Sequence, residues 1–211
     1  MKLSIALIVA AFAIVPSVAF AEGITVQQRP EQTPADRVTC INALRAFRLT
    51  GHDSPKLGAS IVYLAMRNAQ DDPKGETVTD RYLEILSELQ DQPLPTATEA
   101  EAMIKRCYTA DSLASGDQVR AFPANAFKRD LVCRAALFLV IQSSRRLGDT
   151  PERKRLTEVE TRFAAKTTPQ RYYENGLRTE AAMKALVLEI AISSLSIGTS
   201  YAIADACSTL A

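Results

Sequence analysis

The stretch DLVCRAALF, residues 130 to 138, decides the fold because it repeats an earlier stretch, RVTCINALRAF at residues 37 to 47. Superposing Cys133 on Cys40 aligns an alanine three residues later and a leucine four residues later. Residues at this spacing share one face of an α-helix. A Gly-to-Pro turn follows each stretch, and it comes four residues later in the second copy, which is about one helical turn and keeps the apolar face in phase.

A second comparison supports an internal duplication. The ranges 79 to 107 and 179 to 207 both begin with threonine and end with cysteine, and they align without a gap. In this register Thr98 aligns with Gly198, which predicts a break in what otherwise reads as one helix from 180 to 207. Alternatively, a short helix at about 169 to 175 would give the second half an even number of helices without a break near Gly198.

The repeats predict an all-α fold. We expect a helical bundle of two four-helix halves, related by the duplication and tied by disulfides. The first half covers residues 33 to 111 and the second covers residues 126 to 211. Residues 112 to 125, SLASGDQVRAFPAN, form the connection between them.

Helix starts are marked by hydroxyl side chains that precede proline or a first-turn carboxylate. Thr33-Pro34, Ser54-Pro55 and Thr150-Pro151 each place a capping residue before a proline that needs no amide donor there. A further helix is expected after Thr79. Another is expected at a capping box formed by Thr98 and Glu101.

The amino-terminal residues read as an export signal. Lys2 precedes an apolar run that ends in Ala19-Phe20-Ala21, so we expect residues 1 to 21 to be a signal peptide cleaved before Glu22. Residues 22 to 32 carry little apolar content and are expected to form a flexible leader. The sequence thus predicts a periplasmic or secreted protein with no membrane span after cleavage.

All four cysteines fall in the expected mature chain. An oxidising compartment and an even number of cysteines favour two disulfides over metal ligands or redox thiols. In each half one cysteine lies early in the first helix and the other near the end of the last. Since those ends meet in an up-and-down bundle, we favour Cys40 with Cys107 and Cys133 with Cys207 among the three possible pairings.

The charge balance argues against two classes of partner. Lys2 is the single charged residue before residue 22, so the mature chain holds 24 basic and 24 acidic residues. Nucleic acids and anionic membranes require clustered excess positive charge, and we therefore expect no nucleic-acid binding. Acidic residues predominate before residue 120 and basic residues after it, so the two halves are expected to attract each other.

No motif indicates catalysis. His52 is the single histidine, and its neighbours Asp53 and Ser54 are too close in sequence to form a triad with it, so an exposed turn residue is expected. The chain has no nucleophile elbow, metalloprotease motif or phosphate loop, and we predict no catalytic, cofactor or metal residue. Tyr172 and Tyr173 are possible contact residues, although a lid over the core is the commoner use of such a pair.

Two functions remain as hypotheses. The first is an exported non-enzymatic protein that binds an unidentified protein partner in the cell envelope or medium. The alternative is a helical protein that binds a small apolar ligand, with the serine-rich, charge-free segment 190 to 204 lining a cavity between helices. A continuous apolar pocket at this segment would favour the alternative, whereas close helix packing there would favour the first.

Overall fold

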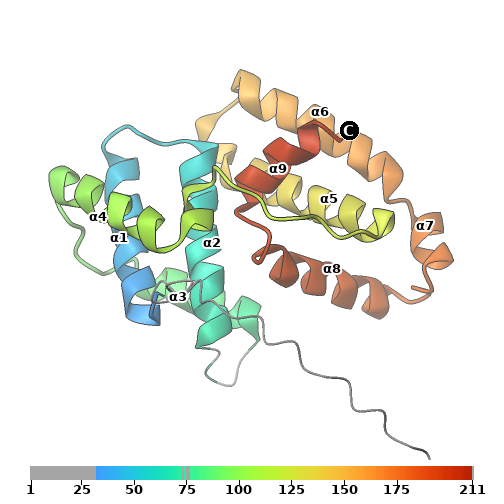
Figure 1. Ribbon diagram of the computed structural model, residues 1–211, viewed down its shortest axis with the longest axis horizontal. Coiled ribbons are helices and arrows are strands. Elements are labelled where there is room, and N and C mark those ends of the chain that lie inside the picture. Colours follow the sequence, from blue (N-terminus) through green and yellow to red (C-terminus); the bar gives the residue numbers. More distant parts are fainter. Residues whose placement is uncertain (1–31, 73, 75–76, 211) are drawn as a thin grey trace, which may run out of the picture.

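The computed structural model describes residues 32–72, 74 and 77–210 of the chain. Every regular element in these residues is a helix, and two of the elements are short 3-10 turns (Figure 1). The predicted signal peptide, residues 1 to 21, lies outside the described residues, as does the predicted leader up to residue 31. In chain order the elements are α1 (Pro34–Leu49), α2 (Pro55–Asp71), α3 (Val78–Glu88), α4 (Ala97–Ala110), η1 (Ser112–Ser115), α5 (Ala126–Ser143), η2 (Arg145–Leu147), α6 (Pro151–Lys166), α7 (Pro169–Glu174), α8 (Glu180–Ser194) and α9 (Ser200–Ser208).

The three start signals that place a hydroxyl residue before proline are confirmed. The side chains of Thr33, Ser54 and Thr150 each accept a hydrogen bond from the backbone amide three residues later, at the starts of α1, α2 and α6. Each bond satisfies one of the amides that a helix start leaves without an intrahelical partner. The local sequence therefore determines where these helices begin.

Two predicted helix starts are wrong by two residues. Helix α3 is capped by Thr77 instead of Thr79, and the capping box of α4 pairs Thr96 with Glu99 instead of Thr98 with Glu101. The segment TATEAE offers both Thr-x-x-Glu frames. The earlier frame adds two residues to the helix and still satisfies both end groups, so it is the better start.

The predicted break near Gly198 is confirmed. Helix α8 ends at Ser194 and α9 begins at Ser200, and Thr199 caps the new helix. The turn is held against the connection between the halves, because the amide of Arg120 donates to the carbonyl of Ile197 at 2.8 Å. The short helix α7 is present as well. The second half therefore contains both the break and the short helix, which were expected as alternatives.

The two predicted disulfides are present. Cys40–Cys107 joins α1 to α4, and Cys133–Cys207 joins α5 to α9. Each bridge therefore connects the first helix of one half to its last helix. No helix in the described ranges has both the length and the apolar content needed to cross a bilayer.

The core consists of two large apolar clusters and a small one formed by Ala43, Ala46 and Ala100. One large cluster lies among α1 to α4, and the other lies among α5 to α9. Helix α2 packs against both α5 and α9 and joins the two groups of helices, as its central position in Figure 1 shows. The clusters also interlock, since Ala59 of α2 belongs to the second cluster and Leu195 from the end of α8 belongs to the first.

Helices α3 and α8, which correspond in the alignment of the halves, pack differently. Helix α3 packs on α2, the second helix of its half, whereas α8 packs on α5, the first helix of its half. The pairs α1 with α2 and α1 with α4 do have counterparts in α5 with α6 and α5 with α9. With α8 packed on α5, space remains between α8 and its neighbouring helices. The candidate site lies in this space.

Candidate functional site

A cavity of about 450 Å³ lies against one face of α5. The α5 residues that line it recur at helical spacing, and α8 forms the opposite wall, while α6 and α7 contribute one residue each. The lining residues are Leu131, Arg134, Ala135, Phe138, Leu139, Glu160, Tyr172, Val187, Ile190 and Ala191.

A second cavity of about 210 Å³ lies between α8 and the helices α2 and α3. Leu139 and Ala191 line both cavities, so the two spaces adjoin each other at this pair. The other lining residues of the second cavity are Val62, Tyr63, Met66, Thr79, Tyr82, Leu188, Ser194, Leu195, Gly198 and Ser200.

Helix α8 covers the cavities loosely because of its composition. It is apolar around most of its circumference, yet only Ile190 and Ser194 are buried. Val187 and Leu188 remain 45% and 42% exposed, so these two apolar side chains lie outside the core. Ala191 presents only a methyl group towards the place where the two cavities meet, so the α8 wall is thin at that point.

The charged groups of the larger cavity are Arg134 and Glu160. Nη1 of Arg134 donates to the hydroxyl of Thr167 at 2.9 Å and to its carbonyl at 3.3 Å, which fixes the guanidinium at the end of α6. Nε of Arg134 lies 3.6 Å from Oε1 of Glu160, a loose ion pair beyond normal hydrogen-bond distance. The larger cavity therefore carries one firmly held cation beside one loosely paired carboxylate.

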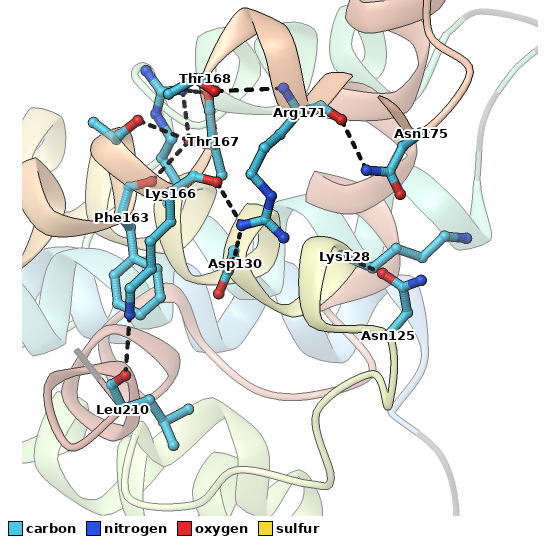
Figure 2. A network of polar contacts seen from close by, with 12 residues as sticks. Asn125, Lys128, Asp130, Phe163, Lys166, Thr167, Thr168, Arg171, Asn175 and Leu210 are labelled. Atoms are coloured by element: carbon cyan, nitrogen blue, oxygen red, sulfur yellow. Dashed lines mark hydrogen bonds and ion pairs between the residues drawn. The ribbon is translucent and has the colours of Figure 1, made fainter. Parts of the chain in front are cut away.

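Helix α7 is clamped onto α5 beside the larger cavity (Figure 2). Nη1 of Arg171 lies 2.9 Å from Oδ2 of Asp130 and donates to the carbonyl of Lys166 at 2.7 Å. Its guanidinium also lies over the ring of Phe127, 5.5 Å from the centroid. This network holds the neighbouring Tyr172 in place, with its ring edge-on to Phe127 at 5.3 Å between centroids.

The smaller cavity contains no Asp, Glu, Lys, Arg or His among its described lining residues. Its two tyrosines stay neutral at ordinary pH. Burial and the neighbouring Asp111 carboxylate raise the pKa of Tyr63, whose hydroxyl donates to Asp111 at 3.0 Å. Burial likewise raises the pKa of Tyr82. The lining of the smaller cavity is therefore uncharged and mostly apolar.

The structure places the residues singled out by sequence in three surroundings. Tyr172 is buried and lines the larger cavity, whereas Tyr173 is 51% exposed. His52 is exposed, as expected, and its ring stacks on Phe47 with 4.3 Å between centroids. The four cysteines lie in the two bridges, away from both cavities under α8.

The segment 190 to 204 lines the cavities along its first part, from Ile190 to Ser200. Its second part, in α9, is packed against α5. Sequence reasoning missed Arg134 and Leu139, although Arg134 stands in the stretch that opened the comparison of halves. Its position in the larger cavity depends on α6 and α8, and no local pattern reveals that contact.

Within the described part of the chain no cluster of three or more His, Cys, Asp or Glu residues is arranged to hold a metal ion. No protein-family model, no curated protein and no solved structure matches the chain. The cavities themselves are therefore the basis for assigning a function.

Proposed function

We propose that this chain is an exported helical binding protein that holds a small apolar ligand in the two adjoining cavities under α8. The observation that carries the proposal is that Leu139 and Ala191 line both cavities, so two mostly apolar spaces lie side by side against α8. The sequence favoured a protein partner first. The adjoining cavities reverse that order, because an apolar pocket along segment 190 to 204 is the feature by which the two hypotheses differ.

The dimensions and chemistry of the site support ligand binding. The larger cavity, at about 450 Å³, lies within the usual range of roughly 300 to 1,000 Å³ for small-molecule sites. Apolar side chains form most of its wall, and Arg134 and Glu160 supply polar groups at one end. This combination of an apolar wall and few polar groups is typical of sites that bind apolar or amphiphilic molecules.

A protein partner remains the second candidate because of a different feature. Phe138, Val187 and Leu188 are 55%, 45% and 42% exposed, and all three border the cavities. An apolar helix of another protein would cover them in the manner of a helix bound in a groove. In that case the cavities would serve to receive side chains of the partner.

We further propose export and an internal duplication. Residues 1 to 21 have the pattern of a signal peptide, and two disulfides are compatible with an oxidising compartment. The duplication draws on the two aligned stretches and on the matching positions of the bridges. Mass measurement of protein isolated from the envelope or medium tests export, because a soluble cytoplasmic form that keeps residues 1 to 21 would contradict it.

Ligand binding is tested by filling the shared wall. The neutral fluorescent probe 1-aminoanthracene should bind the parent protein and be displaced by decanol. Ala191→Trp should weaken binding of the probe at least about tenfold, since the indole fills the place where the cavities meet. Ala185→Trp, on the exposed side of the same helix, is the matched control and should bind like the parent.

Two results would contradict ligand binding under α8. One is a parent protein that binds neither the probe nor decanol. The other is an Ala191→Trp variant that folds, as shown by its circular dichroism spectrum, and still binds the probe with the affinity of the parent.

A further inference from the structure

We infer that the ligand under α8 is a single-chain amphiphile with an anionic head group, such as a fatty acid. Its head group binds Arg134, and its tail passes Leu139 and Ala191 into the smaller cavity. This inference rests on the proposed function and adds the chemical class of the ligand and its orientation.

The first argument is the uneven distribution of charge along the site. Both ionised side chains, Arg134 and Glu160, line the larger cavity. The smaller cavity is lined by uncharged residues, and the pKa values of its tyrosines are raised, so it stays neutral. A charged head group buried there without a partner would lose its hydration with little compensation. An amphiphile therefore fits in one orientation only.

The second argument is distance. Arg134 precedes Leu139 by five residues on α5, which corresponds to about 7.5 Å along the helix axis. Leu139 marks the junction of the two cavities. A ligand that contacts both Arg134 and Leu139 must therefore be extended along α5, and the rest of its tail continues towards Met66 on α2. A short, compact apolar molecule would not use both spaces.

The third argument is the hydrogen-bonding capacity of Arg134. A guanidinium carries five N–H donors. Nη1 is engaged with Thr167, while Nε makes only the loose contact with Glu160. Among the described residues no hydrogen bond from Nη2 is found. The fixed guanidinium therefore keeps donors in the geometry that suits a carboxylate or phosphate oxygen pair.

Glu160 decides the strength of this interaction. Its carboxylate lies next to the expected position of the head group and disfavours an anion there. At 3.6 Å it forms no hydrogen bond that the ligand would have to break. The charge of Arg134 is thus available to the ligand at reduced strength, and removing the charge of Glu160 should tighten the binding of an anion.

The test compares three ligands of equal chain length: decanoate, decanol and decylamine. Isothermal titration calorimetry with the full mature chain at pH 7.5 and low salt measures each affinity. The parent should bind decanoate more tightly than decanol, and decylamine most weakly. Arg134→Gln should weaken decanoate about tenfold, the size of one charge-assisted contact, and change decanol less than about twofold.

Two further variants complete the design. Glu160→Gln should tighten decanoate about threefold or more and leave decanol unchanged, a gain that loss of folding cannot imitate. Lys128→Gln removes a positive charge from the same helix, α5, at an exposed position outside both cavities. It should leave the affinities for all three ligands as they are in the parent.

The outcomes separate the inference from the function on which it rests. If decanoate and decanol bind equally and Ala191→Trp blocks both, the apolar site stands and the anionic head group is wrong. Tighter binding of decylamine, or no effect of Glu160→Gln on decanoate, also overturns the head-group assignment. If none of the three ligands binds the parent, the ligand-binding function itself fails.

Discussion

The Cα atoms of Cys133 and Cys207 lie 5.7 Å apart, although 74 residues separate them in sequence. The Cα atoms of Cys40 and Cys107 lie 5.9 Å apart across 67 residues. Each bridge closes nearly the whole of one half into a covalent loop. The bridges lie in different apolar clusters, which makes their contributions to stability separable.

Replacing either cysteine pair with alanine should therefore destabilise the protein by a similar amount. The loop-entropy relation gives about 4 kcal/mol for loops of this length. Urea unfolding of the two double variants, Cys40→Ala with Cys107→Ala and Cys133→Ala with Cys207→Ala, measures the losses. A nonreducing peptide map of the parent that showed crossed pairing would contradict the arrangement of two separate loops.

Gly198 is expected to resist enlargement. A Cβ atom at this position would lie 2.8 Å from the carbonyl oxygen of Gln118, a backbone atom that cannot move away easily. Gly198→Ala should lower the free energy of unfolding by about 1–3 kcal/mol, as overpacking does. The matched control is Gly58→Ala inside α2, where the added atom meets Ser143 at an ordinary 3.8 Å. That change should raise the free energy of unfolding by about 0.5–1 kcal/mol, and equal effects of the two changes would contradict the prediction.

Arg171→Met should destabilise the second half, because it leaves the carboxylate of Asp130, only 9% exposed, without its cation. The expected loss is about 2–3 kcal/mol, below that of a fully buried pair since the Arg171 side chain is itself 33% exposed. Lys128→Met is the control. It removes the same charge from an exposed pair with Glu189 at 3.9 Å, and it should cost less than about 1 kcal/mol. Chemical denaturation compares the two, and a loss no greater for Arg171→Met than for Lys128→Met would argue against the clamp.

The capping boxes of α1 and α4 should make stability depend on acid pH. Hydrogen bonds from the Thr33 side chain and backbone lower the pKa of Asp36, and those from Thr96 lower the pKa of Glu99. A lowered folded-state pKa gives stability that is present above the ordinary value, about pH 4, and is lost as pH falls through the lowered value.

The variants Asp36→Asn and Glu99→Gln should thus melt below the parent at pH 7 and converge with it near pH 2. Thermal melting curves between these pH values provide the measurement. Glu101→Gln is the control, because Glu101 takes no part in the capping box of α4. A melting difference that stayed constant down to pH 2 would exclude the capping carboxylates as its source.

Sequence predicted the features of this fold that depend on neighbouring residues. Thr33 and Ser54 cap helices through hydrogen bonds to amides three residues later, so these helix starts can be predicted from the local sequence. The break at Gly198 was visible only through comparison of the halves, because a charge-free run otherwise reads as one buried helix. The frame of the α4 capping box was missed because two overlapping frames satisfy the same local pattern.

The candidate site was predictable in outline and not in detail. A cavity along segment 190 to 204 was one of the two expectations, and the lining of Ile190 and Ala191 agrees with it. The partners of that segment come from α2, α3 and α5, and their approach is determined by how α8 packs. Helical periodicity says which face of α8 is apolar, but it does not say whether a neighbouring helix fills that face.

The position of α2 between the two clusters has a consequence for the integrity of the molecule. Ala59 of α2 contributes to the core of the second half, and Leu195 contributes to the core of the first, so neither core is complete when the halves are separated. Proteolytic cleavage in the exposed segment 117 to 121 would leave two fragments, each closed by its own disulfide. These fragments should remain associated as a noncovalent complex, and each should lose structure when purified away from the other.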